Sequence, residues 1–216
     1  MIPEGHQQRL SGDARLELAA LCRRVIDELA SSTADSAAFA SAGALLRDAV
    51  EVLAAATHGR PYAEAEASMA GYQQHLFIDH SPFSGWLNPL APPMTLTSDG
   101  TEVLGAVTFG AAYEGPPGHV HGGYVAAAFD EVLGFAQGLS GKPGMTAHLG
   151  VDYKSPTPLY QPLRFRGDIE RIDGRKIYAR GELRVEADDR LCATATGLFV
   201  SMKTDTFERL MKIRNG

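Results

Sequence analysis

Apolar residues in the first part of the chain recur at helical spacing. They return every three or four positions in two runs between Ala14 and His58, and a polar stretch at residues 31–35 separates the runs. Serine and aspartate favour a turn and a helix N-cap there, because their side chains satisfy free backbone groups. The pattern predicts a helical hairpin over residues 1–60, followed by an ordered, proline-rich connector over residues 61–99.

The remainder of the chain alternates between strand and helix patterns. Residues 101–113 alternate with period two, and residues 124–139 are apolar on nearly all sides, which is typical of a buried helix. Further strand patterns, separated by turn residues, follow at 145–154, 163–172, 177–187 and 191–202. One strand, one buried helix and four strands in hairpin succession predict an α+β protein in which a curved antiparallel sheet wraps around a long central helix. This is the hotdog fold, expected over residues 100–203, with a C-terminal tail at 204–216.

Composition and charge limit the classes of function. With 44% hydrophobic and 21% charged residues, the 216-residue chain has the composition of a soluble globular protein. A net charge of -6 argues against nucleic-acid binding, whereas a local excess of basic residues at 142–203 permits a site for an anionic small molecule. The sequence predicts neither a membrane span nor a secretion signal, and Cys22 and Cys192 offer no disulfide framework. We therefore expect a cytoplasmic protein.

Asp130 lies in the middle of the apolar helix. A buried carboxylate is costly, so this residue needs a partner, a function or a place on an exposed polar strip. Gly122 and Gly123 precede it at the expected helix start, where the first backbone N–H groups lack intrahelical partners and can stabilise an oxyanion. Gly123 precedes Asp130 by about two helical turns. We therefore expect these donors and the carboxylate to flank one substrate carbonyl.

Two stretches around this carboxylate carry a family resemblance. Residues 118–130 (GHVHGGYVAAAFD) and residues 145–156 (MTAHLGVDYKSP) resemble the PaaI-type hotdog thioesterases, and the resemblance covers about residues 100–203. It implies cleavage of acyl-CoA thioesters, a reaction that needs an activated water or a carboxylate nucleophile and an oxyanion site. It implies no cofactor and no metal.

The resemblance also implies roles for individual residues. Asp130 is implied as the catalytic carboxylate, acting as general base or as nucleophile. Gly123 is implied as the residue whose backbone N–H polarises the thioester carbonyl, and His121 as the residue that shapes the start of the helix. Thr146 is implied as the hydroxyl that positions the carboxylate or the water, across a dimer interface. The residues implied in substrate binding are Gly122, Asp152 (Asn in a family member), Lys154, Arg175 and Lys176.

Other chemistries have weaker support from the sequence. His119 and His121 form an HxH pair that, with His148 or Asp130, is compatible with a metal site, but two loop histidines before a helix are a weak signal. The absence of a GxSxG motif argues against a serine hydrolase. A non-catalytic acyl-CoA-binding hotdog protein and a hotdog hydratase or dehydratase stay open as alternatives.

Two expectations concern assembly and the pocket. The strand pattern at 191–202 is apolar on both faces, and an exposed edge of this kind favours pairing. We therefore expect a homodimer or a dimer of dimers in which the sheets join at this strand. Residues 86–94 of the connector are expected to run near the acyl pocket, with the helical hairpin as an accessory layer.

Overall fold

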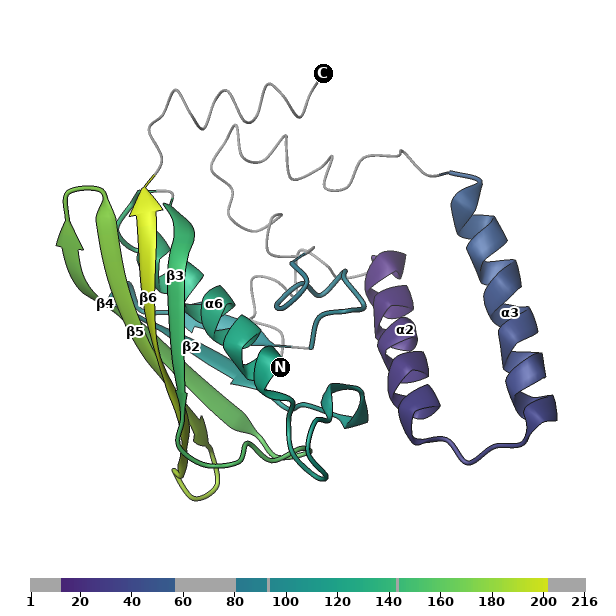
Figure 1. Ribbon diagram of the computed structural model, residues 1–216. Coiled ribbons are helices and arrows are strands. Elements are labelled where there is room, and N and C mark those ends of the chain that lie inside the picture. Colours follow the sequence, from purple (N-terminus) through teal and green to yellow (C-terminus); the bar gives the residue numbers. More distant parts are fainter. Residues whose placement is uncertain (1–12, 57–80, 93, 143, 202–216) are drawn as a thin grey trace.

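A computed structural model of the chain describes residues 13–56, 81–92, 94–142 and 144–201. A six-stranded antiparallel sheet curves around one long helix, α6, and two further helices lie beside them (Figure 1). The predicted hotdog fold is confirmed. The elements are α2 (Ala14–Ser31), α3 (Ser36–Ala54), β1 (Thr95–Ser98), β2 (Glu102–Val107), the 3₁₀ helix η1 (Ala111–Tyr113), α6 (Gly122–Gly138), β3 (Gly144–Tyr153), β4 (Leu163–Asp173), β5 (Lys176–Val185) and β6 (Leu191–Ser201).

The strands follow the order β1-β2-β4-β5-β6-β3 across the sheet. The expected hairpin succession is correct for β4, β5 and β6 but wrong for β3, which pairs with β6 and not with β4. Pro156, Pro158 and Pro162 lie in the connection after β3, where their missing N–H groups prevent a continuous ladder. The strand at 191–202 is therefore interior, and the expectation that it forms a sheet edge is wrong. The edges are β1 and β3.

The start of the sheet also differs from the expectation. Residues 95–98, assigned to the connector, form the short edge strand β1 paired with β2. The turn between them is built by Asp99, whose Oδ1 accepts hydrogen bonds from the backbone N–H groups of Thr101 (2.8 Å) and Glu102 (3.0 Å). The strand expected to reach Tyr113 ends at Val107, and the chain leaves the sheet to form η1.

Helix α6 packs on the concave side of the sheet, where two strand glycines allow a close approach. A Cβ atom at Gly167 would lie 2.9 Å from Val132 Cγ1, and one at Gly181 would lie 2.7 Å from the carbonyl oxygen of Arg166 and 3.2 Å from Leu133 Cδ2. Side chains at these two sites would push the helix away. The core consists of the inner face of α6 and the inward residues of the strands, together with Met94, Phe109, Tyr113, Val120 and Leu159 from η1 and the loops.

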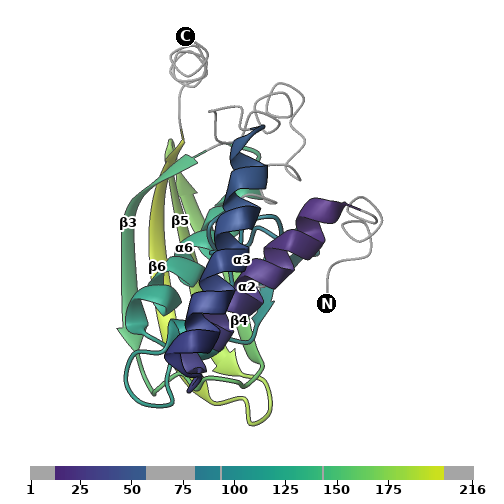
Figure 2. The ribbon, with the colours of Figure 1, turned by 90° about the vertical axis from the view of Figure 1, so that its right-hand side faces the viewer.

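The helical hairpin is confirmed for the residues that the structure describes. Asp13 and Asp35 cap its two helices, and Asp35 Oδ1 accepts from the N–H of Ala38 at 2.8 Å. Helix α2 lies between α6 and α3 (Figure 1), and α3 crosses in front of α6 in the turned view (Figure 2). The expected helix end at residues 57–58, connector residues 61–80 and the tail at 204–216 lie outside the described residues. Within the described part, no helix is long and apolar enough to cross a membrane.

Candidate active site

Asp130 and Thr146 form the centre of the candidate site. Thr146 on β3 donates a hydrogen bond from Oγ1 to Asp130 Oδ1 at 2.9 Å, and both residues belong to one chain. Asp130 is half-buried on the side of α6 that faces the edge strand, away from the apolar core. The carboxylate therefore keeps contact with solvent, and this lowers the cost of a charge on an otherwise apolar helix.

His121 caps the start of α6 and occupies one of the predicted oxyanion donors. Its Nδ1 atom accepts a hydrogen bond from the Gly123 N–H at 3.0 Å, and its carbonyl oxygen accepts from Tyr124 at 2.9 Å. A histidine is a less common N-cap than Ser, Thr, Asp or Asn. Among the described residues, the Gly122 N–H has no hydrogen-bond partner, so the donor free for a ligand at this helix end is Gly122.

Tyr153 is a further residue at this helix end that the sequence did not indicate. Its hydroxyl donates to the carbonyl oxygen of Gly122 at 2.7 Å, and a Cβ atom at Gly122 would lie 3.3 Å from Tyr153 Oη. It lies in the 145–156 stretch that carries the family resemblance, one residue before Lys154, but no role was assigned to it. The contact ties the end of β3 to the first turn of α6.

The edge strand β3 runs antiparallel along α6 and lines one side of the helix. Thr146 reaches Asp130 near the middle, Tyr153 reaches the helix start, and Gly144 lies against Gln137 at the other end, where an added Cβ atom would be 2.7 Å from Gln137 Oε1. The Asp130 carboxylate and the start of α6, with its free Gly122 N–H, therefore both lie beside the edge strand β3.

The basic residues predicted to bind substrate lie at opposite ends of the sheet. Lys154 follows β3 close to the start of α6 and is 3.8 Å from the exposed carboxylate of Asp152. Arg175 lies in the turn before β5 and donates from Nε to the carbonyl oxygen of Ser201 at 2.9 Å. The two ends are about nine residues apart along β6, or roughly 30 Å at 3.3 Å per residue. One chain therefore does not bring Lys154 together with Arg175 and Lys176.

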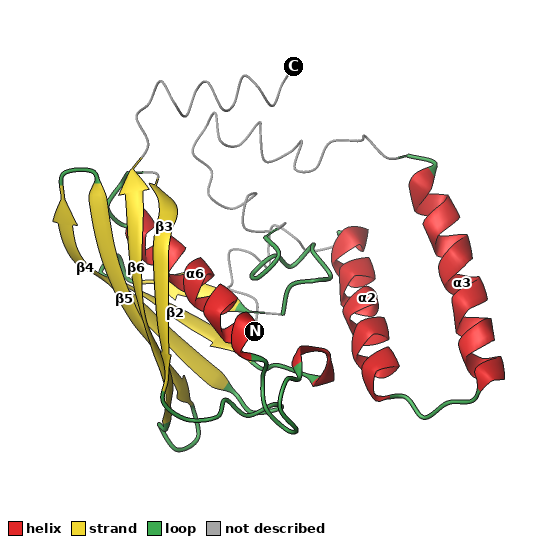
Figure 3. Ribbon diagram, in the orientation of Figure 1, coloured by secondary structure: helices red, strands yellow, loops and turns green. Residues whose placement is uncertain are grey.

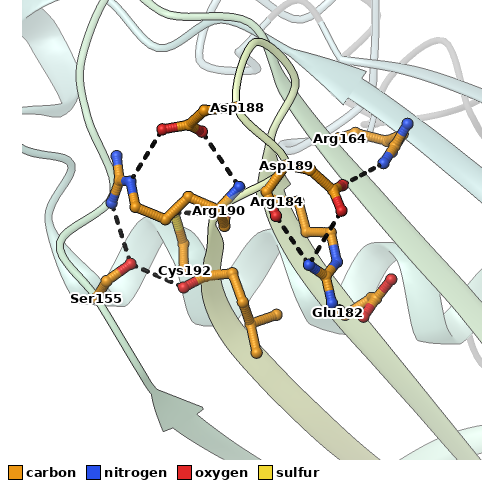
Figure 4. Close-up of polar contacts among 9 residues, drawn as sticks. Ser155, Arg164, Glu182, Arg184, Asp188, Asp189, Arg190 and Cys192 are labelled. Carbon is orange, nitrogen blue, oxygen red and sulfur yellow. Dashed lines mark hydrogen bonds and ion pairs between the residues drawn. The ribbon is translucent and has the colours of Figure 1, made fainter.

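A polar network fixes the segment that follows Lys154 (Figure 4). Arg190 donates from Nη1 to Ser155 Oγ and to the carbonyl oxygen of Pro156, both at 3.0 Å, and pairs with Asp188. Ser155 Oγ in turn donates to the carbonyl oxygen of Leu191 at 2.8 Å. These bonds hold the chain after β3 against the start of β6, and they fix the position of the backbone at Lys154.

The two loop histidines of the HxH pair are engaged with nearby backbone. His119 Nδ1 lies 2.8 Å from the carbonyl oxygen of Pro117, and His121 Nδ1 receives the Gly123 N–H. Within the ranges that the structure describes, no three His, Cys, Asp or Glu side chains gather as metal ligands. The geometry offers a carboxylate, a hydroxyl and backbone donors.

Comparison with known proteins identifies the family. Residues 117–193, which contain every site residue named above, match the thioesterase superfamily. The crystal structure of a thioesterase superfamily protein is 38% identical to this chain with a TM-score of 0.74, and the match covers 88% of this chain and 92% of that one. The chain belongs to the thioesterase superfamily.

Among curated proteins, the chain is similar to acyl-coenzyme A thioesterase THEM4. The protein of Xenopus laevis is 38% identical over 93 residues, which cover 43% of this chain and 42% of that protein. The protein of Rattus norvegicus is 33% identical over 99 residues, covering 44% and 41%. These matches span less than half the length of the curated relatives.

Proposed function

We propose that this protein is an acyl-CoA thioesterase, which hydrolyses an acyl-CoA to the free acid and CoA. The hydrogen-bonded pair of Asp130 and Thr146, placed on the open side of the central helix, carries the proposal. The similarity to acyl-coenzyme A thioesterase THEM4 and the membership of the thioesterase superfamily support it. The two free cysteines fit a reducing compartment, which we propose to be the cytoplasm.

The proposed reaction uses the carboxylate and the helix start. Asp130 takes a proton from water, which adds to the thioester carbonyl carbon; alternatively, the carboxylate attacks the carbon itself and water then hydrolyses the anhydride. Backbone N–H groups at the start of α6 stabilise the oxyanion, with Gly122 as the free donor and Gly123 as a second donor once it leaves His121. The C–S bond breaks, and the CoA thiolate takes up the proton. Thr146 keeps Oδ1 of the carboxylate in place.

The spacing of these groups favours a site shared between two chains. Gly122 and Asp130 are eight residues apart, or about 12 Å along the helix axis at 1.5 Å per residue. This distance is beyond what one carbonyl and one attacking water span, since each contact reaches roughly 3 Å. We therefore propose a homodimer in which the N-terminus of α6 from one subunit faces Asp130 of the other.

Strand β3 supplies the proposed dimer contact. It is a ten-residue edge with a single charged residue, Asp152, near its end, and Met145 and Tyr153 on it are exposed. Long uncharged edges pair readily with another strand. Antiparallel pairing of two β3 strands about a two-fold axis places their α6 helices antiparallel and side by side. It also brings the Lys154 end of one subunit toward the partner's Arg175 and the partner's Lys176, where they can contact the CoA phosphates together.

A hydrolysis screen tests the proposed activity. The purified protein is assayed for CoA thiol release from short-chain, long-chain and aryl acyl-CoAs, and the same acyl-CoAs are titrated calorimetrically. Turnover of at least one of them is expected. Tight binding without thiol release would indicate the non-catalytic binder, and hydration of an enoyl-CoA without thiol release would indicate the hydratase; either result overturns the proposal.

Complementation between two inactive variants tests the shared site. Gly122→Pro removes the free N–H at the first helical position, where proline is well tolerated; the preceding His121 has the extended backbone that proline requires (φ -61, ψ 130). Gly122→Ala is the matched control because it keeps the N–H. Co-expressed Gly122→Pro and Asp130→Asn chains should regain about one quarter of wild-type activity, because a random mixture of shared sites leaves one site in four intact. No recovery would show that each site lies within one chain.

The domain organisation completes the proposal. We propose that the sheet and α6 form the thioesterase domain from residue 95 onwards, that residues 81–92 belong to the connector before it, and that helices α2 and α3 form an accessory layer beside it. Limited proteolysis checks this division. Cuts are expected between these parts, and an early cut within residues 144–201 would contradict it.

A further inference from the structure

An irregular segment, residues 81–91, is held on one side by the catalytic helix. The hydroxyl of Ser81 donates to Glu131 Oε1 at 2.6 Å, and the hydroxyl of Ser84 donates to the same oxygen. Both serines are buried, and Ser81 Oγ also accepts from the N–H groups of Phe83 and Ser84. Glu131 therefore holds the turn that begins the segment.

The other side of the same segment is held by α2. The half-buried guanidinium of Arg23 donates to four backbone carbonyl oxygens of the segment: Gly85 (3.0 Å), Trp86 (2.6 Å), Asn88 (3.1 Å) and Ala91 (3.1 Å). Burial lowers the pKa of Arg23, yet a guanidinium stays protonated at working pH and so keeps all its donors. A single side chain thus provides hydrogen-bond donors for four backbone carbonyl oxygens of a segment that has no regular structure.

These two attachments place the segment beside the candidate carboxylate. Asp130 and Glu131 are neighbours on α6 and point about 100° apart around the helix axis. Asp130 faces β3, and Glu131 faces the segment. Gly134 lies on the outer face between them, where an added Cβ atom would meet nothing within 4 Å. Figure 3 shows the segment as a green loop between α6 and α2.

We propose that Arg23 and Glu131 are positioning residues that hold segment 81–91 as one wall of the acyl-binding region, opposite β3. The inference rests on the proposed thioesterase function and adds a specificity element to it. The wall depends on α2, which lies outside the stretch that matches the family. In this view, the N-terminal helix acts on substrate choice through Arg23, without touching the substrate.

The test compares substitutions of Arg23 and Glu131 with a matched control. Arg23→Met removes all four hydrogen bonds, Arg23→Lys restores some of them, and Glu131→Gln keeps an acceptor oxygen for the two serines. Arg24→Met is the control, because Arg24 is the exposed neighbour on the same helix. For each folded variant, kcat and KM are measured with one short and one long acyl-CoA, together with calorimetric Kd values and the melting temperature.

Arg23→Met should raise KM for the long acyl-CoA severalfold relative to the short one, with kcat on the short substrate nearly kept. For Arg23→Lys and Glu131→Gln, the long-to-short ratio of KM should lie between the ratios of Arg23→Met and the wild type. Arg24→Met should have the wild-type ratio. A lower melting temperature with an unchanged long-to-short ratio of KM and of Kd would overturn the inference, because it would show a merely structural role. Failure of the proposed function would appear as absent turnover in the wild type. The long-to-short ratios of Kd would then still test whether Arg23 and Glu131 affect acyl-chain preference.

Discussion

Replacement of Asp130 by asparagine tests the proposed catalytic carboxylate directly. Asparagine keeps the side-chain volume and an Oδ1 atom that can accept the hydrogen bond from Thr146, which is 2.9 Å long in the structure. Because the side chain is only half-buried at the edge of α6, we expect the free energy of unfolding to change by about 1 kcal/mol or less. The variant should therefore fold.

The catalytic effect should be much larger than the effect on stability. An amide neither takes a proton from water at neutral pH nor attacks a carbonyl, and a positioned general base contributes roughly 10²- to 10⁴-fold to the rate. We expect kcat to fall by on the order of 100-fold or more, with little change in KM for the acyl-CoA. This loss corresponds to about 3 kcal/mol of transition-state stabilisation or more.

The assay follows CoA thiol release alongside thermal unfolding of the same sample. Asp168→Asn is the matched control, since Asp168 pairs with Arg180 on the neighbouring strand, away from the candidate site. That variant should keep wild-type turnover. If a folded Asp130→Asn protein turned over its substrate at a near-normal rate, Asp130 would have no role in the chemistry.

Three further predictions follow from single contacts. Arg175→Ala should raise KM for acyl-CoA severalfold with kcat nearly kept, and this increase in KM should become smaller as the salt concentration rises. An equal increase in KM for a truncated thioester without the nucleotide would show that Arg175 is structural. Gly134→Ala should raise stability by about 0.5–1 kcal/mol, because its Cβ meets open space within a helix; a lower melting temperature would contradict the open space. Burial, and next the charge of Asp27, raises the pKa of Tyr113 from 10.0 to about 12, so the stability that the neutral phenol contributes is present below pH 10.0 and lost as the pH rises towards 12. Urea titrations at several pH values should show this fall in the wild type and a flatter profile in Tyr113→Phe.

The elements with a regular hydrophobic period were predictable from the sequence. The two N-terminal helices, α6 and strands β3 to β6 were expected close to their observed positions, because each has a clear helical or alternating pattern. The position of β3 in the sheet was not predictable, since pairing depends on where a proline-rich connection leads. Strand β1 was missed because its four residues, Thr-Leu-Thr-Ser, are too few to show a period.

The candidate site was predictable only where residues lie close together in the sequence. The pattern around Gly122, Gly123 and Asp130 pointed to a helix start followed by a carboxylate. The contacts of Tyr153, Glu131 and Arg23 were not predictable, because their partners lie 31 to 68 residues away and include backbone carbonyl oxygens, which leave no mark on residue type. The family resemblance placed His121 at the helix start, but its hydrogen bond to the Gly123 N–H was not predicted, because histidine is a less common N-cap than Ser, Thr, Asp or Asn.

The close packing of α6 on Gly167 and Gly181 has a consequence for redesign of the protein. Because the side chains of Val132 and Leu133 pack directly over glycine main chain, these two residues and the sheet backbone set the height of α6 above the strands. Variants with substitutions in the sheet under α6 should therefore fail to fold before the position of Asp130 changes. Changes on the outer side of the helix leave that height untouched, so new acyl preferences should be sought there, with the carboxylate kept in register.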